Sequence, residues 1–257
     1  MTALGSKEFW LESLRGDANA FRAIAAEADL DAPVPTCPGW TVRDLVHHLG
    51  GVYRWVLAFA GRGTTEAPDP ELRRRSLNED FPPEGETLAW WDEQASSLVK
   101  LLESVDPQLP AWNWAPQAKV ASFWHRRMAN ETAVHRWDMQ MSQGLAEPID
   151  TRLAADGVRE VLDSYLPAQR LRKGPTDRFG VVALLSTDTE HEWFIRLRGE
   201  GIALLDTATI LDHTDPNEQV TAAGTASDLD LALWGRIGFD MLDVSGDESL
   251  LYALRIG

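Results

Sequence analysis

Cysteine is nearly absent from this chain of 257 residues, because Cys37 is the only one. A single cysteine excludes an intrachain disulfide and fits the reducing cytosol, so we expect a cytoplasmic protein. A lone thiol could serve as a nucleophile, but small cysteines are more often inert parts of a core. We therefore interpret Cys37 as a buried structural residue.

Long apolar stretches are also missing. The sequence has no run of about 18 apolar residues, the length that a transmembrane helix needs. The first seven residues lack the apolar segment of a signal peptide. We accordingly expect no membrane-spanning segment.

Basic residues are scarce relative to acidic ones, with 24 Lys and Arg against 40 Asp and Glu and a formal net charge of -16. Such a surface repels phosphate backbones and anionic lipid headgroups. The charge therefore argues against nucleic acid and membranes as partners. We expect a small-molecule substrate and a monomer or weak homo-oligomer.

What the sequence has in quantity is apolar surface, since 44% of its residues are hydrophobic. This share is enough for genuine cores and too high for a disordered chain. The length exceeds a typical domain of about 100–150 residues, which predicts one large or two modest domains.

The first part of the chain, residues 1–146, reads as a helical bundle. Apolar residues recur at helical spacing in three segments, a Thr41–Asp44 capping box marks the start of the second, and a fourth helix is expected after the loop 106–117. The charged, proline-containing stretch 62–85 is expected to be a long loop. Four helices with long connections predict a four-helix bundle. The expected helices are 8–28, 41–60, 87–103 and 120–142.

The second part, residues 147–257, changes character. Short runs of alternating or apolar residues between polar turns are typical of strands, and they are flanked by helical patterns. We expect a small α+β domain. Its predicted strands are 179–185, 192–197, 202–206 and a possible fourth at 219–223, and its predicted helices are 151–165, 226–234 and 247–254.

Three side chains in the first part have metal-ligating chemistry. Glu131 and His135 lie four residues apart on one helix, so both face the same side, about 6 Å apart along its axis. His48 lies on the second helix, which a bundle can place opposite. Two imidazoles and one carboxylate are a common catalytic zinc set that leaves a position open, although nickel or iron would also accept it. An exposed i,i+4 pair without metal is the alternative.

Neighbouring residues could support such a site. Asp138 shares a face with Glu131, and Asp44 precedes His48 by four residues, so either could accept the second N–H of a ligand imidazole. Asp44 also has the competing role of capping-box acid, which we favour. His47 points about 100° away from His48 on the helix. Trp40, beside the start of this helix, could line a pocket.

Three stretches resemble one protein family. Residues 34–50 read VPTCPGWTVRDLVHHLG, residues 131–138 read ETAVHRWD, and residues 224–236 read GTASDLDLALWGR. In this order they resemble the mycothiol-dependent maleylpyruvate isomerase family. The resemblance implies an N-terminal DinB-like metal-binding bundle followed by a sterol-carrier-like α+β domain.

The resemblance also implies a site and a chemistry. His48, Glu131 and His135 stand where the family has its metal ligands, and Arg236 stands where it has an arginine at the active site. The implied cofactors are a divalent metal, expected to be zinc, and mycothiol as thiol cosubstrate. Thiolate addition to an activated double bond permits rotation and hence isomerisation, whereas irreversible addition amounts to thiol transfer. Arg236 could hold a substrate carboxylate.

Family and fold do not fix the reaction, so other functions stay open. The metal could instead activate water for hydrolysis. The chain could also be a ligand-binding protein, because its second domain resembles lipid carriers, or a regulatory protein without catalysis. Turnover with metal and thiol would distinguish an enzyme from both.

Overall fold

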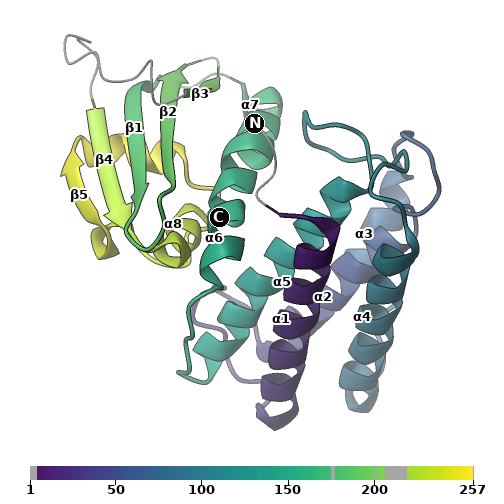
Figure 1. The fold of residues 1–257 in the computed structure, drawn as a ribbon. Helices are drawn as coiled ribbons and strands as arrows, with labels where there is room; N and C mark the ends of the chain where they lie inside the picture. Colours follow the sequence, from purple (N-terminus) through teal and green to yellow (C-terminus); the bar gives the residue numbers. More distant parts are fainter. Residues whose placement is uncertain (1–4, 175–176, 200, 206–218, 257) are drawn as a thin grey trace. The chain divides into compact units, whose positions relative to one another are not determined.

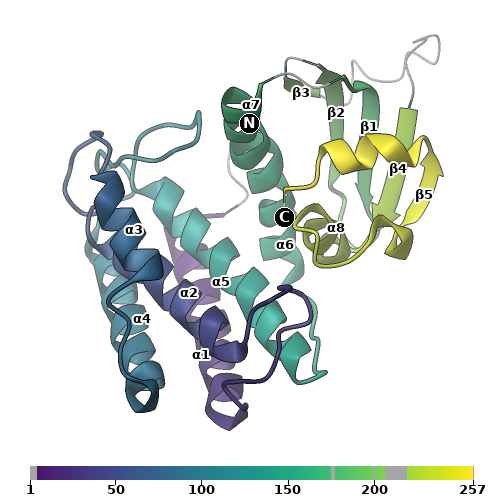
Figure 2. The same ribbon diagram turned by 180° about the vertical axis from the view of Figure 1, so that it is seen from behind.

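The computed structural model describes residues 5–174, 177–199, 201–205 and 219–256 (Figures 1 and 2). The chain divides into two compact units. The first comprises Met1–Asn113 and Ala118–Ile149, and the second comprises Trp114–Gln117 and Asp150–Gly257. None of the described helices is long and apolar enough to cross a membrane.

The first unit is built on four long helices, which confirms the predicted helical bundle. Helices α1 and α2 each pack against both α4 and α5 (Figure 1). Their facing sides carry aliphatic and aromatic residues that are fully or almost fully buried, so burial of these side chains holds the bundle together. The four helices are α1 (Lys7–Glu27), α2 (Val42–Leu57), α4 (Thr87–Ser104) and α5 (Ser122–Ser142).

Helix α2 begins as the sequence predicted. The Thr41 hydroxyl accepts a hydrogen bond from the backbone N–H of Asp44, and the Asp44 carboxylate accepts one from the backbone N–H of Thr41. This reciprocal pair satisfies two of the backbone N–H groups that have no acceptor within the helix at its start. It also fixes the role of Asp44, which is the capping residue of the helix.

The expectation of a loop throughout 62–85 is wrong. This stretch contains α3 (Pro70–Asn78) and a short 3-10 turn, η1 (Glu84–Glu86). Pro70 is the first residue of α3, where its missing N–H costs nothing, and Asp69 caps it by accepting from Glu71 N–H. The prolines therefore start a helix here instead of preventing one.

Helix α3 approaches α2 closely because a glycine faces it. A Cβ on Gly51 would lie 2.6 Å from the carbonyl oxygen of Ser76. The end of α3 is then fixed by Arg54 of α2, whose guanidinium donates to the carbonyls of Ser76 and Glu79 at 2.7 Å and of Asp80 at 2.8 Å. A cation at the C-terminal end of a helix also complements its dipole.

The second unit is the small α+β domain that the sequence predicts. Its sheet has the order β3-β2-β1-β4-β5, in which β1 and β4 are parallel and the other neighbours antiparallel. Helix α8 contacts both α6 and the strands β1 and β4. The strands are β1 (Phe179–Ser186), β2 (Glu192–Arg198), β3 (Ile202–Leu205), β4 (Gln219–Gly224) and β5 (Asp243–Gly246), and the α-helices are α6 (Thr151–Glu160), α7 (Leu166–Lys173) and α8 (Ala226–Leu233).

Three details of this unit differ from the sequence prediction. The expected helix 151–165 continues through a π-helical turn, η2 (Val161–Tyr165), into α7. The expected last helix is a 3-10 helix, η5 (Glu248–Ala253), and the short strand β5 was not predicted. Asp206, the last residue of the expected third strand, lies outside the described residues.

Candidate metal centre

His48, Glu131 and His135 come together in the first unit, as their positions in the sequence predict. One carboxylate oxygen of Glu131, Oε1, lies 3.3 Å from Nε2 of His48 and 3.4 Å from Nε2 of His135. The three ligand atoms all lie within 4.8 Å of one another. The imidazoles meet nearly edge to face, with ring centroids 4.8 Å apart. The cluster thus joins α2 to α5.

The two separations from Glu131 Oε1 match those between neighbouring ligand atoms of a tetrahedral metal. Metal–ligand bonds of ~2.0–2.2 Å at the tetrahedral angle put neighbouring ligand atoms ~3.3–3.5 Å apart. Charge-assisted N–H···O bonds are shorter, about 2.7–2.9 Å. The two separations from Glu131 Oε1 are 3.3 and 3.4 Å. These two separations are therefore compatible with a shared divalent ion.

Asp138 orients the second histidine. Its Oδ2 accepts a hydrogen bond from Nδ1 of His135 at 2.9 Å, while its Oδ1 accepts one from the Thr36 hydroxyl at 2.6 Å. With Nδ1 donating to Asp138, the neutral form of the ring would carry its lone pair on Nε2, the atom that faces Glu131 and that a metal ion would bind. Of the two acids considered from the sequence, Asp138 therefore supports the cluster and Asp44 does not.

The charges around Glu131 keep it ionised. Burial alone would raise the pKa of Glu131, but the Arg127 guanidinium and the hydrogen bonds from His135 and His48 outweigh it, so its pKa lies well below the usual value. Burial would lower the pKa of His135, but its contacts with Asp138 and Glu131 raise it above the ordinary value. The carboxylate is thus ready to bind a cation.

His48 is the most exposed of the three candidate ligands. The His48 side chain is 30% exposed, compared with 12% for Glu131 and 7% for His135. Trp40 lies against both rings, with centroids 4.8 Å from His48 and 6.5 Å from His135. The indole therefore packs beside both imidazoles, and its expected role in lining a pocket stays a prediction.

The loop before α2 brings a second set of potential ligands near the first. Cys37, His135 and Asp138 also have ligand atoms within 4.8 Å of one another, and all three are buried. Cys37 is 8% exposed, in keeping with the small buried residue that we expected. Among the described residues these two sets, which share His135, are the groups that could hold a metal ion.

Two further histidines of the bundle, His47 and His125, have other roles. His47 stacks on Phe81 at 4.3 Å and meets Trp90 edge to face, away from the cluster. His125 is buried with its ring nitrogens 2.9 Å from the Ala121 carbonyl oxygen and 2.8 Å from that of Leu102. Both histidines pack the bundle and hold no position in the cluster.

Arg236 lies in the second unit, in the turn that follows α8. Its backbone N–H donates to the Leu231 carbonyl at 2.8 Å, and its guanidinium donates to the Trp234 carbonyl at 3.0 Å. Gly235 precedes it with a φ of +69°, the left-handed conformation that favours glycine at a helix end. Its assignment to an active site stays a prediction.

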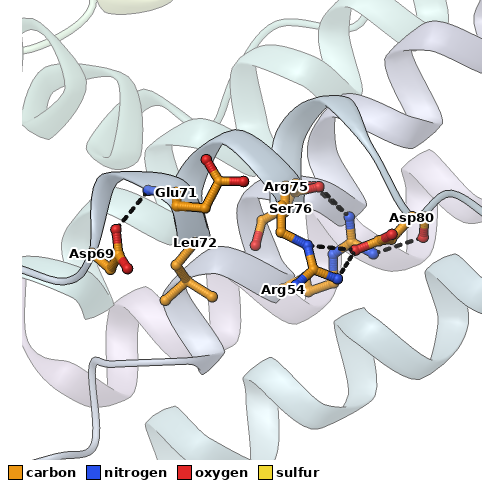
Figure 3. Close-up of a pocket in the computed structure, with 7 residues that line it drawn as sticks. All are labelled: Arg54, Asp69, Glu71, Leu72, Arg75, Ser76 and Asp80. Carbon is orange, nitrogen blue, oxygen red and sulfur yellow. Dashed lines mark hydrogen bonds and ion pairs between the residues drawn. The ribbon is translucent and has the colours of Figure 1, made fainter.

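A separate surface pocket lies between α2 and α3 (Figure 3). Its charged side chains are largely engaged with one another or with backbone, as Arg75 is with Asp80 at 2.6 Å and Arg54 is with the end of α3. None of the three candidate ligands lines it. We interpret this pocket as a consequence of the hydrogen bonds and ion pairs that hold α3 against α2.

Sequence reasoning missed one charged member of the site. Arg127, four residues before Glu131 on α5, forms an ion pair with Glu131 Oε2, and its side chain is only 3% exposed. An Arg and a Glu at this spacing are common on exposed helix faces. Only the burial of both side chains reveals that the pair belongs to the cluster.

Fold and cluster together define a class: a helical bundle with a His–Glu–His site between two helices, joined to a small α+β unit. Two family models match the sequence. The mycothiol maleylpyruvate isomerase N-terminal domain matches residues 11–140, and the MDMPI C-terminal domain matches residues 152–253. The chain belongs to the mycothiol maleylpyruvate isomerase family, which is a family of enzymes.

Solved structures show the same fold. The chain is similar to the mycothiol-dependent maleylpyruvate isomerase, with a TM-score of 0.65 and 15% identity over 95% of this chain and 96% of that one. A histidine-to-alanine mutant of that enzyme gives a TM-score of 0.66 with the same identity and coverage. At this identity the likeness speaks for the fold alone. No curated protein matches the chain by sequence.

Proposed function

We propose that His48, Glu131 and His135 bind one divalent metal ion, with zinc the expected species. The observation that carries the proposal is the position of one Glu131 oxygen at 3.3 and 3.4 Å from two imidazole Nε2 atoms. The donor set, two nitrogens and one oxygen, is that of many catalytic zinc sites. Three protein ligands leave a fourth position for a substrate group.

We propose further that the chain is a thiol-dependent enzyme, an isomerase or thiol transferase that uses mycothiol or a similar thiol on a small electrophile. Membership of the mycothiol maleylpyruvate isomerase family supports this reaction class. A divalent ion supplies positive charge that favours the thiolate, which is the nucleophilic form of a thiol. The single cysteine supports the reducing cytoplasm as the place of action.

The chain's own residues divide the remaining tasks. Asp138 holds the His135 ring in one orientation and one tautomer. Trp40 shields both imidazoles on one side and offers an apolar surface to a ligand. Arg236 is assigned to the substrate carboxylate, for which a guanidinium is suited by charge and by its parallel donors.

Metal analysis of the purified protein tests the site. After expression with added zinc, we expect about one equivalent in the wild type and loss of that metal in His48→Ala, Glu131→Ala and His135→Ala. His47→Ala is the matched control, because His47 is the adjacent histidine on the same helix and stacks on Phe81 instead. Wild-type protein without metal, or equal loss in the control, would contradict the site.

Activity is a separate test. We expect the metal-loaded protein to convert maleylpyruvate, or an analogous activated cis double bond, only when mycothiol is present. Reversible addition should release the trans isomer, whereas transfer should leave a stable thiol adduct. Mass spectrometry of the products separates the two reactions. Turnover without any thiol would refute the thiol-dependent mechanism while leaving the metal site in place.

A further inference from the structure

The two carboxylate oxygens of Glu131 face different groups. Oε1 faces Nε2 of His48 and Nε2 of His135, whereas Oε2 is in the ion pair with Arg127. The Arg127 and Glu131 side chains are 3% and 12% exposed, so this is a buried pair and not a solvated pair on a helix surface. Each oxygen of the carboxylate thus has its own direction and its own partner.

The burial of this pair calls for an explanation, because burying a guanidinium costs free energy unless its charge is compensated. Arg127 and Glu131 are one helical turn apart on α5, so the helix itself sets their spacing. A carboxylate without such a neighbour can turn and offer both oxygens to a metal. A donor held on Oε2 prevents that rotation and keeps Oε1 directed at the histidines.

We propose that Arg127 is a positioning residue that keeps Glu131 a one-oxygen ligand and so preserves open coordination positions for the reacting groups. This inference rests on the metal site proposed above. It also concerns charge. A divalent ion, the carboxylates of Glu131 and Asp138 and one guanidinium sum to one positive charge, whereas the sum without Arg127 is zero. The site is therefore suited to an anionic thiol cosubstrate and a carboxylate-bearing electrophile.

Two substitutions separate the positive charge of Arg127 from its volume. Arg127→Gln keeps much of the length and an N–H donor but removes the charge, and Arg127→Lys keeps the charge with a different donor shape. Loss of a partner behind a metal ligand weakens metal binding by roughly 10- to 100-fold. We expect this loss in Arg127→Gln, whereas Arg127→Lys should stay within a few-fold of the wild type.

The readouts are metal affinity, by competition with a chelator, and the visible spectrum of the Co²⁺-substituted protein. Neither requires turnover. Four-coordinate Co²⁺ absorbs much more strongly than Co²⁺ of higher coordination number, so a Glu131 that binds through both oxygens should weaken the spectrum in Arg127→Gln. The matched control is Arg136→Gln, another buried arginine of α5, which pairs with Asp17. It should lower stability and leave the spectrum of the folded protein unchanged.

Each outcome is decisive. Arg127→Gln with wild-type affinity and spectrum overturns the proposal, and so does Arg127→Lys that loses metal as strongly as Arg127→Gln. If Arg127→Gln does not fold, the Lys variant still decides, because wild-type affinity supports the role of the charge and a tenfold or greater loss contradicts it. Absence of metal from the wild-type protein would instead refute the underlying site, so the two failures are distinguishable.

Discussion

Arg136 fastens the bundle, and its replacement by Gln should destabilise the first unit strongly. The guanidinium donates to Asp17 of α1 at 3.0 Å, to Gln140 of α5, and to the carbonyls of Glu147 and Pro148 at 2.8 and 3.2 Å. Its side chain is 5% exposed and that of Asp17 is 17% exposed. One side chain thus ties two helices and the segment that follows α5.

The magnitude follows from burial. Breaking a buried ion pair costs about 3–5 kcal/mol because the remaining charge is left uncompensated. Asp17 retains some contact with water and can be partly rehydrated, so we expect about 2–4 kcal/mol for Arg136→Gln. For a unit of this size each kcal/mol lowers Tm by roughly 2–4 °C, which gives a decrease of roughly 4–16 °C.

Chemical denaturation followed by tryptophan fluorescence is the assay, since most tryptophans lie in the first unit. A double-mutant cycle with Asp17→Asn isolates the ion pair from the other contacts. We expect the two substitutions together to cost less than the sum of their separate costs. A variant within about 0.5 kcal/mol of the wild type, the range of ordinary surface substitutions, would refute the reasoning.

The remaining predictions concern packing, pH and the second unit. Gly51→Ala should destabilise the protein by about 1–3 kcal/mol, because its Cβ would lie 2.6 Å from the Ser76 carbonyl oxygen. Gly16→Ala should instead stabilise α1 by about 0.5–1 kcal/mol, because no atom lies within 4 Å of its Cβ. Equal Tm values for the two variants would contradict both predictions. Metal affinity should fall as the pH drops through the raised pKa of His135, since the ion must then displace a proton, and a flat affinity between pH 5 and 8 would contradict this. Arg236→Lys should retain metal but lose about 30- to 1,000-fold in kcat/KM, about 2–4 kcal/mol; normal turnover would remove Arg236 from the site.

The helices of the bundle and the three candidate ligands were accessible from sequence for clear reasons. Glu131 and His135 have fixed geometry once their segment is helical, and the capping box fixes where the helix of His48 begins. The capping role of Asp44 was accessible too, whereas the pairing of Asp138 with His135 was not, because it depends on which groups the Thr36 loop and the His135 ring meet in three dimensions.

Helix α5 shows why other features were missed. It buries many polar residues, among them Arg127, Asn130 and Arg136, so its core-facing side cannot be recognised by hydrophobic spacing. Arg136 pairs with Asp17 of α1, a partner far away in sequence that leaves no local pattern, whereas Arg127 pairs with Glu131 on its own helix. Short elements such as β5, with four residues, carry too few positions to be distinguished from loops.

The most direct test of the metal centre is a crystal structure of the zinc-loaded protein with diffraction data on both sides of the zinc absorption edge. We predict one anomalous peak at ~2.0–2.2 Å from Nε2 of His48, Nε2 of His135 and Oε1 of Glu131. No peak, or a peak among Cys37, His135 and Asp138 instead, would contradict the proposed site.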